Sequence, residues 1–367
     1  MGKSVLFLAT DAHGAGGGIA QYNRDVIDAL AGMECVEQIN VLPRHGNGRH
    51  DNAPLKTSYP PRQPHGRAAY VWLLLRAVLG LKTDLIYCAH INLLSLAWLA
   101  KRITGAPIVL VLYGIDAWGK PPRLMRWMLQ SVDALASISQ ITLDCFTAWA
   151  GPLPCPVHIL PNAIDVTRFG TGKANPVLAA RWGLDGGPFI MTFGRMSASE
   201  RYKGFDEVLD ALPRLCATIP SLRYILAGDG DDRPRLEAKA QALGVAPHCV
   251  FIGYLPESEK ADAFRLADAY VMPSHGEGFG FVVLEALACG IPVVVSTTDG
   301  TFEAVRGGLL GRAVDPAESQ ALVDAIIAAV RTPKAIPAGL DYFNTAQFAA
   351  RLRAAIMPLL GVQLPKG

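Results

Sequence analysis

The sequence predicts an α/β protein of two doubly wound domains, each a parallel sheet covered by helices. Three observations carry this prediction. The first two are that short β-rich runs alternate with helical patterns along the chain, and that the alternation starts a second time near Phe189. The third is size, because a chain of 367 residues, 51% of them hydrophobic, can bury two ordinary cores.

The first series of elements lies in the N-terminal half and the second in the C-terminal half. Strands are expected at 5–9, 39–42, 84–88 and 108–112 with helices at 19–31 and 93–102, then strands at 189–193, 224–227, 249–252, 269–272 and 293–296. Residues 151–188, rich in Pro, Gly and Asn, indicate a linker and the entry into a new domain. We expect a first domain over 1–165, rejoined by a C-terminal helix within 343–367, and a second over 166–342.

Charge and cysteine content exclude several classes of function. With 34 basic and 32 acidic side chains the net charge is +2, so no field of the kind that attracts nucleic acid is expected. The seven cysteines have no CxxC or other metal-ligand spacing, which indicates reduced thiols and no metal site. The apolar stretches 70–81 and 85–100 are shorter than the roughly 20 residues that span a bilayer. We expect a cytoplasmic protein without nucleic-acid partners.

Residues 62–82 combine basic and aromatic side chains around a leucine run. The basic residues of this segment are Arg62, Arg67, Arg76 and Lys82. Such a composition suits peripheral contact with a membrane or a lipid acceptor, and it also suits a domain helix with one buried face and a few solvated arginines. The segment 120–130 leaves the same two interpretations open.

The most informative segment is MPSHGEGFGFVVLEALACGIPVVVS, which begins at Met272. A strand that ends at Met272 leads into a glycine-rich loop and then into a helix over about 282–289. Glycines at a helix start leave backbone N–H groups open, and such a start is an anion site suited to a diphosphate. Glu277 and Glu285 are about two helical turns apart, so they could share one side of the helix. The alternative is a capping Glu277 and a solvated Glu285.

Two basic residues follow the first strand of the second half, in FGRMSASERYKGF. Arg195 comes directly after the strand, at the carboxyl edge of the sheet, and Lys203 precedes a helix. Together they could neutralise a departing diphosphate without a metal, although each alone could be a surface charge. In the first half, Gly17 and Gly18 of HGAGGGIAQYNRDV permit close approach of a phosphate or sugar. The spacing G-x-G-x-x-G is missing there, which disfavours a nicotinamide site.

Asp229, Gly230 and Asp231 form a D-x-D pattern, which can indicate a metal site. The pattern follows the expected strand 224–227 and opens a helix. N-capping carboxylates are therefore the simpler interpretation, and we expect no metal.

The chain resembles the retaining family-four glycosyltransferases in six segments, which occur in this order: AGGGIAQYNRDVIDAL, ILPNAIDVTRF, FGRMSASERYKGFDEVLDAL, YILAGDGDDRPRLE, FIGYLPESEKADAFRLADAYVMPS and EGFGFVVLEALACGIPVV. The resemblance covers nearly the whole chain, and the last segment is its most specific part. It implies the GT-B fold, in which two Rossmann-like domains face each other across a cleft.

The resemblance also implies a binding site for a nucleoside-diphosphate sugar. Glu285 would hold the ribose hydroxyls, whereas Glu277 would contact the transferred sugar. The implied donor-binding residues are Gly17, Gly18, Arg195, Lys203, Tyr254, Leu255, Lys260, Glu277, Gly278, Phe279, Gly280, Phe281 and Glu285. Arg195 and Lys203 would bind the diphosphate, while Tyr254, Leu255 and Lys260 would pack on the base.

One departure from the family pattern concerns the strand that ends at Leu112. Family members commonly have His-Gly there, and that histidine contacts the sugar, but this chain has Tyr113 followed by Gly114. Tyr113 could replace the histidine as a hydrogen-bond donor, or His90 at the end of the neighbouring strand could do so. The alternative for His90 is a hydrogen-bonded histidine at a strand end.

The implied activity is metal-independent transfer of a hexose, of mannose or glucose type, with retention of configuration. Catalysis would rest on Glu277, Arg195 and Lys203, with His90 or Tyr113. The acceptor would be a glycan, a lipid-linked glycan or a small molecule, and the pathway cell-surface polysaccharide synthesis on the inner face of the membrane. A sugar-nucleotide 2-epimerase and a non-catalytic sugar-nucleotide-binding subunit are the alternatives.

Overall fold

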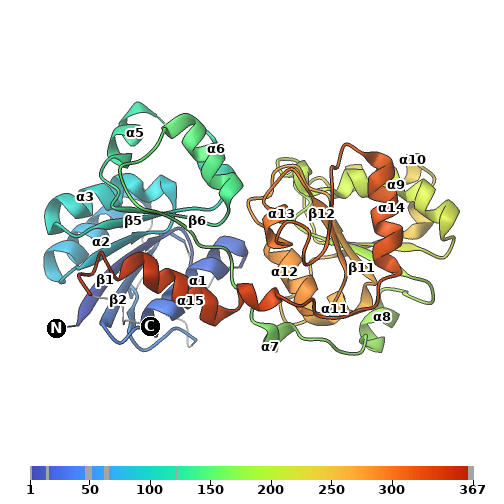
Figure 1. The fold of residues 1–367 in the computed structure, drawn as a ribbon, viewed down its shortest axis with the longest axis horizontal. Helices are drawn as coiled ribbons and strands as arrows, with labels where there is room; N and C mark the ends of the chain where they lie inside the picture. The colour runs from blue at the N-terminus through green and yellow to red at the C-terminus, as the bar shows by residue number, and fades with distance from the viewer. Residues whose placement is uncertain (1, 14–15, 46–51, 62–65, 121, 363–367) are drawn as a thin grey trace. The chain divides into compact units, whose positions relative to one another are not determined.

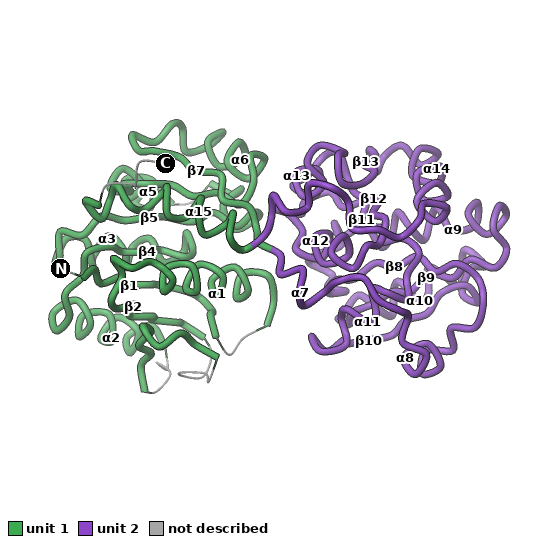
Figure 2. Tube along the Cα trace, turned by 60° about the horizontal axis from the view of Figure 1, so that its bottom comes forward, with its two compact units in different colours: residues 1–163, 345–367 green, residues 164–344 purple. Residues whose placement is uncertain are grey.

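The computed structural model describes residues 2–13, 16–45, 52–61, 66–120 and 122–362. The chain divides into two compact units (Figure 2). Unit 1 comprises Met1–Ala163 and Thr345–Gly367, and unit 2 comprises Ile164–Asn344.

Unit 1 is built on a parallel sheet with the strand order β3-β2-β1-β4-β5-β6-β7 (Figure 1). Its described elements, in chain order, are β1 (Lys3–Ala9), α1 (Gly18–Ala31), β2 (Val36–Pro43), β3 (Thr57–Ser58), α2 (Gly66–Gly80), β4 (Leu85–Cys88), the 3₁₀ helix η1 (Ile91–Leu93), α3 (Leu94–Thr104), β5 (Ile108–Leu112), α4 (Ile115–Trp118), α5 (Arg123–Leu129), β6 (Ala134–Ser137), α6 (Gln140–Ala150), β7 (Val157–Ile159) and α15 (Thr345–Ile356).

Unit 2 is built on a second parallel sheet with the strand order β10-β9-β8-β11-β12-β13. Its elements are α7 (Val166–Phe169), α8 (Pro176–Arg181), β8 (Phe189–Phe193), η2 (Arg201–Lys203), α9 (Phe205–Thr218), β9 (Arg223–Ala227), α10 (Arg233–Ala242), η3 (Ala246–His248), β10 (Cys249–Gly253), α11 (Lys260–Leu266), β11 (Ala269–Met272), α12 (Phe281–Ala288), β12 (Val293–Ser296), α13 (Thr301–Ala304), β13 (Arg312–Val314), α14 (Ser319–Val330) and η4 (Leu340–Phe343).

The central strands explain why each sheet lies inside its unit. All five residues of β5 and all four residues of β11 are buried. Strands covered by helices on both faces have no solvent side, so they are continuous apolar runs rather than alternating ones. The fold class predicted from the sequence, two doubly wound parallel sheets, is confirmed.

The two sheets share one topology. In each, the chain runs outward from a central strand and then returns to the other side of that strand. The order reverses between β1 and β4 in unit 1 and between β8 and β11 in unit 2. Ligands of doubly wound folds bind outside the carboxyl ends of the strands at such reversals, which locates a candidate site in each unit.

The C-terminal helix begins later than expected and belongs to unit 1. The sequence predicted this helix within 343–367, but Asn344 is extended and pairs with Ile164, so η4 ends before it and α15 begins after it. Phe348 of α15 packs edge-on against Tyr22 of α1, with ring centroids 5.4 Å apart. This aromatic contact fixes α15 beside α1 (Figure 1).

The length and apolar character of the helices bear on whether the chain can cross a bilayer. Among the described residues, no helix is long and apolar enough to cross a membrane. In the segment 62–82, helix α2 covers residues 66–80, whereas Arg62 lies outside the described residues.

Candidate active site

An ion pair marks the reversal point of the unit 2 sheet. Lys203 Nζ lies 3.0 Å from Glu277 Oε2, and it also lies 3.7 Å from Glu200 Oε2. Lys203 precedes α9, directly after the loop that leaves β8, and Glu277 belongs to the loop that leaves β11. Burial opposes the charged form of Lys203, but Glu277 and its neighbours outweigh burial and raise the pKa of the lysine. Lys203 therefore holds a fixed positive charge at this edge.

The loop that carries Glu277 is held by the turn after β12. Asp299 Oδ2 accepts a hydrogen bond from the Glu277 N–H at 2.9 Å, and Gly300 N–H donates to the Glu277 carbonyl at 2.9 Å. A Cβ at Gly300 would lie 2.1 Å from the carbonyl oxygen of Gly278, so only glycine fits there. Neither Asp299 nor Gly300 was predicted from the sequence. The Asp-Gly pair shortly after strand 293–296 indicates a turn there and could have drawn attention to both residues.

The start of α12 is open toward the same loop. Gly280 precedes the helix with φ of 91°, a left-handed conformation that favours glycine. Within the part of the chain that the structure describes, the backbone N–H groups of Phe281 and Val282 have no protein acceptor. Phe279, in the loop that carries Glu277, is buried, and its ring packs edge-on against Phe343, which supports the loop. The arrangement can receive an anion next to Lys203.

Glu285 is a buried carboxylate paired with a buried amine. Its side chain is 10% exposed, and its Oε1 lies 2.9 Å from Lys260 Nζ. Lys260 also contacts Glu257 at 2.7 Å and lies over the Phe193 ring at the end of β8. Burial raises the pKa of Glu285, and Lys260 offsets part of that rise. The alternative of a solvated Glu285 and a capping Glu277 is wrong, because Glu285 is buried and no side chain caps α12.

The second oxygen of Glu285 is unsatisfied. Among the described residues, Glu285 Oε2 is buried without a hydrogen-bond partner. An unmatched buried acceptor costs about 1–3 kcal/mol, so a protein gains when a ligand hydroxyl supplies the missing donor. Glu285 is thus prepared to accept from a polyhydroxylated ligand.

The donor-binding residues predicted after β8 and β10 differ in exposure. Arg195 has 71% of its side chain exposed and lies 3.4 Å from Glu200. Tyr254, just after β10, is 78% exposed, whereas its neighbour Leu255 is buried. An exposed aromatic ring beside a buried leucine offers a flat apolar surface for stacking.

The D-x-D segment has a different local role from the predicted one. Helix α10 begins after Asp232, and no side chain caps it, so the interpretation of Asp229 and Asp231 as N-caps is wrong. Asp231 instead accepts from the Ala198 N–H at 3.0 Å, which tethers the loop after β8. The described residues contain no group of three or more His, Cys, Asp or Glu side chains arranged to hold a metal.

In unit 1, the loops after β1 and β4 meet the reversal point of that sheet. Gly17 precedes α1 with φ of 99°, a Cβ there would meet nothing within 4 Å among the described residues, and Gly17 and Gly18 are exposed. His90 follows β4 and is buried, and its Nδ1 accepts from the Asn92 N–H at 3.1 Å. That bond places the proton of a neutral imidazole on Nε2.

His90 and Tyr113 differ in what their polar atoms contact. The Tyr113 hydroxyl is buried and donates to Asn23 Oδ1 at 2.7 Å, so its hydrogen is engaged within the protein. His90 Nε2 lies 3.7 Å from Asp116 Oδ2, which is too far for a hydrogen bond. Burial lowers the pKa of His90 and raises the pKa of Asp116 to about 7. His90 therefore carries a neutral N–H donor that no described group accepts.

Comparison with protein families places both halves of the chain. Residues 180–337 match the family described as Glycosyl transferases group 1, and residues 16–168 match Glycosyltransferase Family 4. A mannosyltransferase of Mycolicibacterium smegmatis, described as GDP-mannose-dependent alpha-(1-6)-phosphatidylinositol monomannoside mannosyltransferase, is 31% identical over 62% of this chain and 62% of its own length. The glycogen synthase of Mycobacterium tuberculosis is 32% identical over 57% of this chain and 48% of its own length. The chain thus spans less than two thirds of either relative.

Solved structures establish the fold. The HepE protein of Anabaena, solved in complex with UDP and glucose, matches with a TM-score of 0.74 at 21% identity, over 97% of this chain and 100% of its own. The lipopolysaccharide outer core galactosyltransferase WaaB matches with a TM-score of 0.72 at 18% identity, over 97% of this chain and 99% of its own. With two parallel sheets of matching topology and a family match in each half, this chain belongs to the group 1, family 4 glycosyltransferases of the GT-B fold.

Proposed function

We propose that this protein is a retaining, metal-independent hexosyltransferase that uses a nucleoside-diphosphate sugar as donor. The observation that carries the proposal is the Lys203–Glu277 ion pair beside the open start of α12, at the reversal point of the unit 2 sheet. A lysine held charged by a carboxylate next to unpaired backbone N–H groups matches a diphosphate that gains negative charge as it departs.

The proposed reaction is a single substitution step at the anomeric carbon, and it uses the positive charge of Lys203. The bond between the anomeric carbon and the diphosphate oxygen breaks, and its electron pair leaves with the diphosphate. Lys203, Arg195 and the backbone of 278–281 neutralise that charge. The acceptor hydroxyl oxygen forms the new bond on the same face, and its proton passes to the departing diphosphate oxygen. Glu277 orients the sugar and holds Lys203 in place, so no protein nucleophile is required.

The nucleoside part of the donor is assigned to the Glu285 region. The unpartnered Glu285 Oε2 supplies an acceptor for ribose hydroxyls, and Lys260 keeps the carboxylate in position at 2.9 Å. Because Oε2 is covered in the present conformation, ribose binding requires a small side-chain shift. Tyr254 and Leu255 form the surface for the base. The name of one relative specifies GDP-mannose, and one solved relative contains UDP and glucose. A ligand screen must therefore include both guanosine and uridine donors.

Unit 1 is assigned to the acceptor and to one contact with the sugar. Of the two predicted candidates, we assign this contact to His90, since its Nε2 proton has no acceptor among the described residues, whereas the Tyr113 hydroxyl already donates to Asn23. Gly17 and Gly18, both exposed, leave room for the donor at the start of α1.

A peripheral membrane contact through α2 is part of the proposal. Trp72 is 60% exposed and Leu79 is 74% exposed on this helix, and the Arg76 guanidinium lies over the Trp72 ring. Exposed apolar rings flanked by arginine suit the boundary of an anionic bilayer. Flotation with anionic liposomes tests this: binding should fall when Trp72→Ser and Leu79→Ser are combined, and unchanged flotation would contradict a membrane role for α2.

The experiment that tests the function is a metal-free thermal-shift screen against GDP, UDP, ADP, dTDP and their hexose conjugates. One nucleoside diphosphate should stabilise the protein, as ligands that bind only the folded state do. The shift should disappear in Glu285→Ala and persist in Glu318→Ala, which removes an exposed glutamate at the start of α14.

Product analysis with the selected donor then separates the reaction classes. Transfer of labelled hexose to an acceptor, with the anomeric configuration kept, supports the proposal. Conversion of the donor to an epimer without sugar transfer would replace it with the epimerase assignment. If no nucleotide shifts the melting curve at millimolar concentration, the donor site itself is wrongly assigned.

A further inference from the structure

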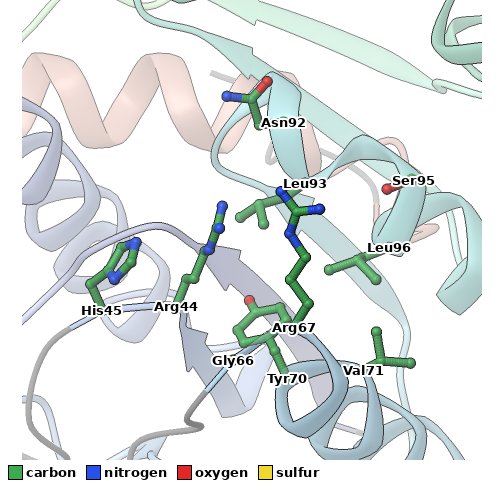
Figure 3. A pocket seen from close by; sticks show the side chains of 10 residues that line it. All are labelled: Arg44, His45, Gly66, Arg67, Tyr70, Val71, Asn92, Leu93, Ser95 and Leu96. Carbon is green, nitrogen blue, oxygen red and sulfur yellow. The ribbon is translucent and has the colours of Figure 1, made fainter.

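A cavity of about 730 Å³ lies in unit 1, apart from the residues assigned to the donor. It opens at the carboxyl edge of the sheet, between the end of β2, the first turn of α2 and the start of α3 (Figure 3). Cavities that hold small molecules commonly measure 300–1,000 Å³. This one can therefore accommodate a sugar-sized ligand.

Two arginines from different elements share this cavity. Arg44 follows β2, and Arg67 is the second residue of α2. Figure 3 shows both side chains extending in the same direction, toward Asn92. Neither guanidinium forms an ion pair with a residue that the structure describes. Among the residues that the structure describes, none that lines the cavity is acidic, and His45 adds a third basic side chain.

Two hydrogen bonds hold in place the segments that carry the arginines. Arg44 N–H donates to the Ala9 carbonyl at 2.9 Å, which fixes it beside the end of β1. The Tyr70 hydroxyl donates to the Leu42 carbonyl at 2.6 Å, which fixes the first turns of α2 beside the end of β2. Two unneutralised guanidiniums on anchored segments lose little freedom when an anion binds between them.

The rest of the lining differs from a simple anion site. Val71, Leu93 and Leu96 give apolar surface, and the side chains of Asn92 and Ser95 give hydrogen-bonding groups. This combination suits a ligand whose anionic group is attached to a polyhydroxylated or partly apolar body. Arg presents its donors as a planar fork that matches the oxygens of a carboxylate or a phosphate in pairs. Two such forks in one cavity match the three free oxygens and the nearly double negative charge of a phosphate monoester better than they match a single carboxylate.

We propose that this cavity binds the phosphate group of a phosphorylated acceptor through Arg44 and Arg67. The inference rests on the proposed transferase activity, since it names the acceptor class for that reaction. The phosphate is not transferred; it anchors the acceptor. The wall opposite the arginines continues into η1, whose N-cap is His90, so an anchored acceptor lies on the same sheet edge as the histidine assigned to the sugar. The phosphate can belong to a soluble sugar phosphate or to a lipid headgroup.

The test is residue-resolved modification of arginines by phenylglyoxal, followed by mass spectrometry, on the full-length protein. The soluble arm uses glucose 6-phosphate with glucose as its neutral counterpart, and the lipid arm uses phosphatidylcholine vesicles with and without phosphatidic acid. Arg102, an exposed arginine on α3, is the internal control for the soluble arm. Arg102 is the reference for the lipid arm as well, because Arg76 belongs to the membrane contact proposed for α2.

Selective protection of Arg44 and Arg67 by glucose 6-phosphate supports a soluble phosphorylated acceptor. Selective protection by phosphatidic acid vesicles, with Arg102 less protected than Arg44 and Arg67, supports a lipid headgroup. No protection by either probe, or protection equal to that of Arg102, overturns the proposal. Arg195 reports on the donor site in the same samples: if UDP and GDP fail to protect it, the proposed function is in question whatever Arg44 and Arg67 show.

Substitution gives a second readout. Arg44→Gln and Arg67→Gln should each weaken glucose 6-phosphate binding about tenfold or more in calorimetry, because each removes a charge-assisted hydrogen bond of roughly 1.5–3 kcal/mol. Arg102→Gln should bind as the parent protein does. Equal affinity in all three variants would contradict the assignment, and nucleotide binding by the variants verifies that they fold.

Discussion

Lys260 Nζ and Glu285 Oε1 form a buried ion pair 2.9 Å apart, with about a tenth of each side chain exposed. Breaking a buried pair is costlier than removing it entirely, because the remaining charge loses its partner. Lys260→Met should therefore destabilise the protein by about 3–5 kcal/mol, whereas adding Glu285→Gln should recover part of the loss. Urea denaturation of the single and double variants measures this coupling.

The matched control is Lys334→Met. Lys334 pairs with Asp268 at 3.0 Å, but both side chains are at least 30% exposed, so its loss should cost less than about 1 kcal/mol. If Lys260→Met costs no more than this control, Lys260 and Glu285 are not an ion pair of structural importance.

Lys203→Met should impair the chemical step more than donor binding. Removing a fixed positive charge from a developing anion lowers kcat by about 100- to 1,000-fold. Steady-state kinetics with the donor selected by thermal shift gives kcat and KM separately. Arg181→Met, which removes an exposed arginine paired with Glu259 on the surface of unit 2, should leave kcat within a factor of about two. A Lys203 variant with normal kcat would remove this residue from the proposed mechanism.

His90→Ala and Tyr113→Phe should separate the two candidates in unit 1. We expect His90→Ala to lower kcat by about 10- to 100-fold through loss of one hydrogen-bond donor to the sugar. Tyr113→Phe should cost about 1 kcal/mol of stability through its lost bond to Asn23, with kcat nearly unchanged. Near-normal turnover in both variants would show that neither side chain contacts the reacting sugar.

Asp116 should make unit 1 less stable as the pH rises. Burial raises its pKa from 3.8 to about 7, so the folded state binds a proton that the unfolded state has already released between these values. The stability due to the protonated form is complete below about pH 4 and is lost as the pH rises through about 7. Relative to the parent, Asp116→Asn should therefore gain about 2.5 kcal/mol between pH 5 and 8.

Thermal denaturation at several pH values checks this, with Asp144→Asn as the exposed control on α6. A stability difference between Asp116→Asn and the parent that stays constant with pH would mean that Asp116 does not titrate in this range.

Gly300→Ala should disturb donor binding through a steric effect alone. The new Cβ would lie 2.1 Å from the Gly278 carbonyl oxygen, which must move and take the Glu277 loop with it. We expect donor affinity to fall about tenfold or more, because the loop is the proposed diphosphate site. Gly80→Ala, where a Cβ meets nothing within 4 Å, is the control. Equal nucleotide affinity in both variants would show that the loop tolerates the displacement.

Local sequence patterns predicted the long buried strands accurately, but they did not predict two short strands of unit 1. β5, β8, β11 and β12 begin and end where the sequence predicted, because buried parallel strands are continuous apolar runs bounded by polar or glycine residues. β6 and β7 were not predicted: ALAS and VHI are too short and too mixed to signal a strand, and they are strands because β5 pairs with β6 and β6 with β7.

The sequence by itself determined the fold class, the family, and the positions of Lys203 and Glu277 after strands and of Glu285 within a helix, since these depend on periodicity and on spacing within short segments. Only the tertiary structure decided which groups meet. Lys260 pairs with Glu285, Asp299 holds Glu277, and Arg44 and Arg67 share one cavity. The physical reason is that strand order brings together the carboxyl ends of strands far apart in sequence, and no local pattern encodes that order.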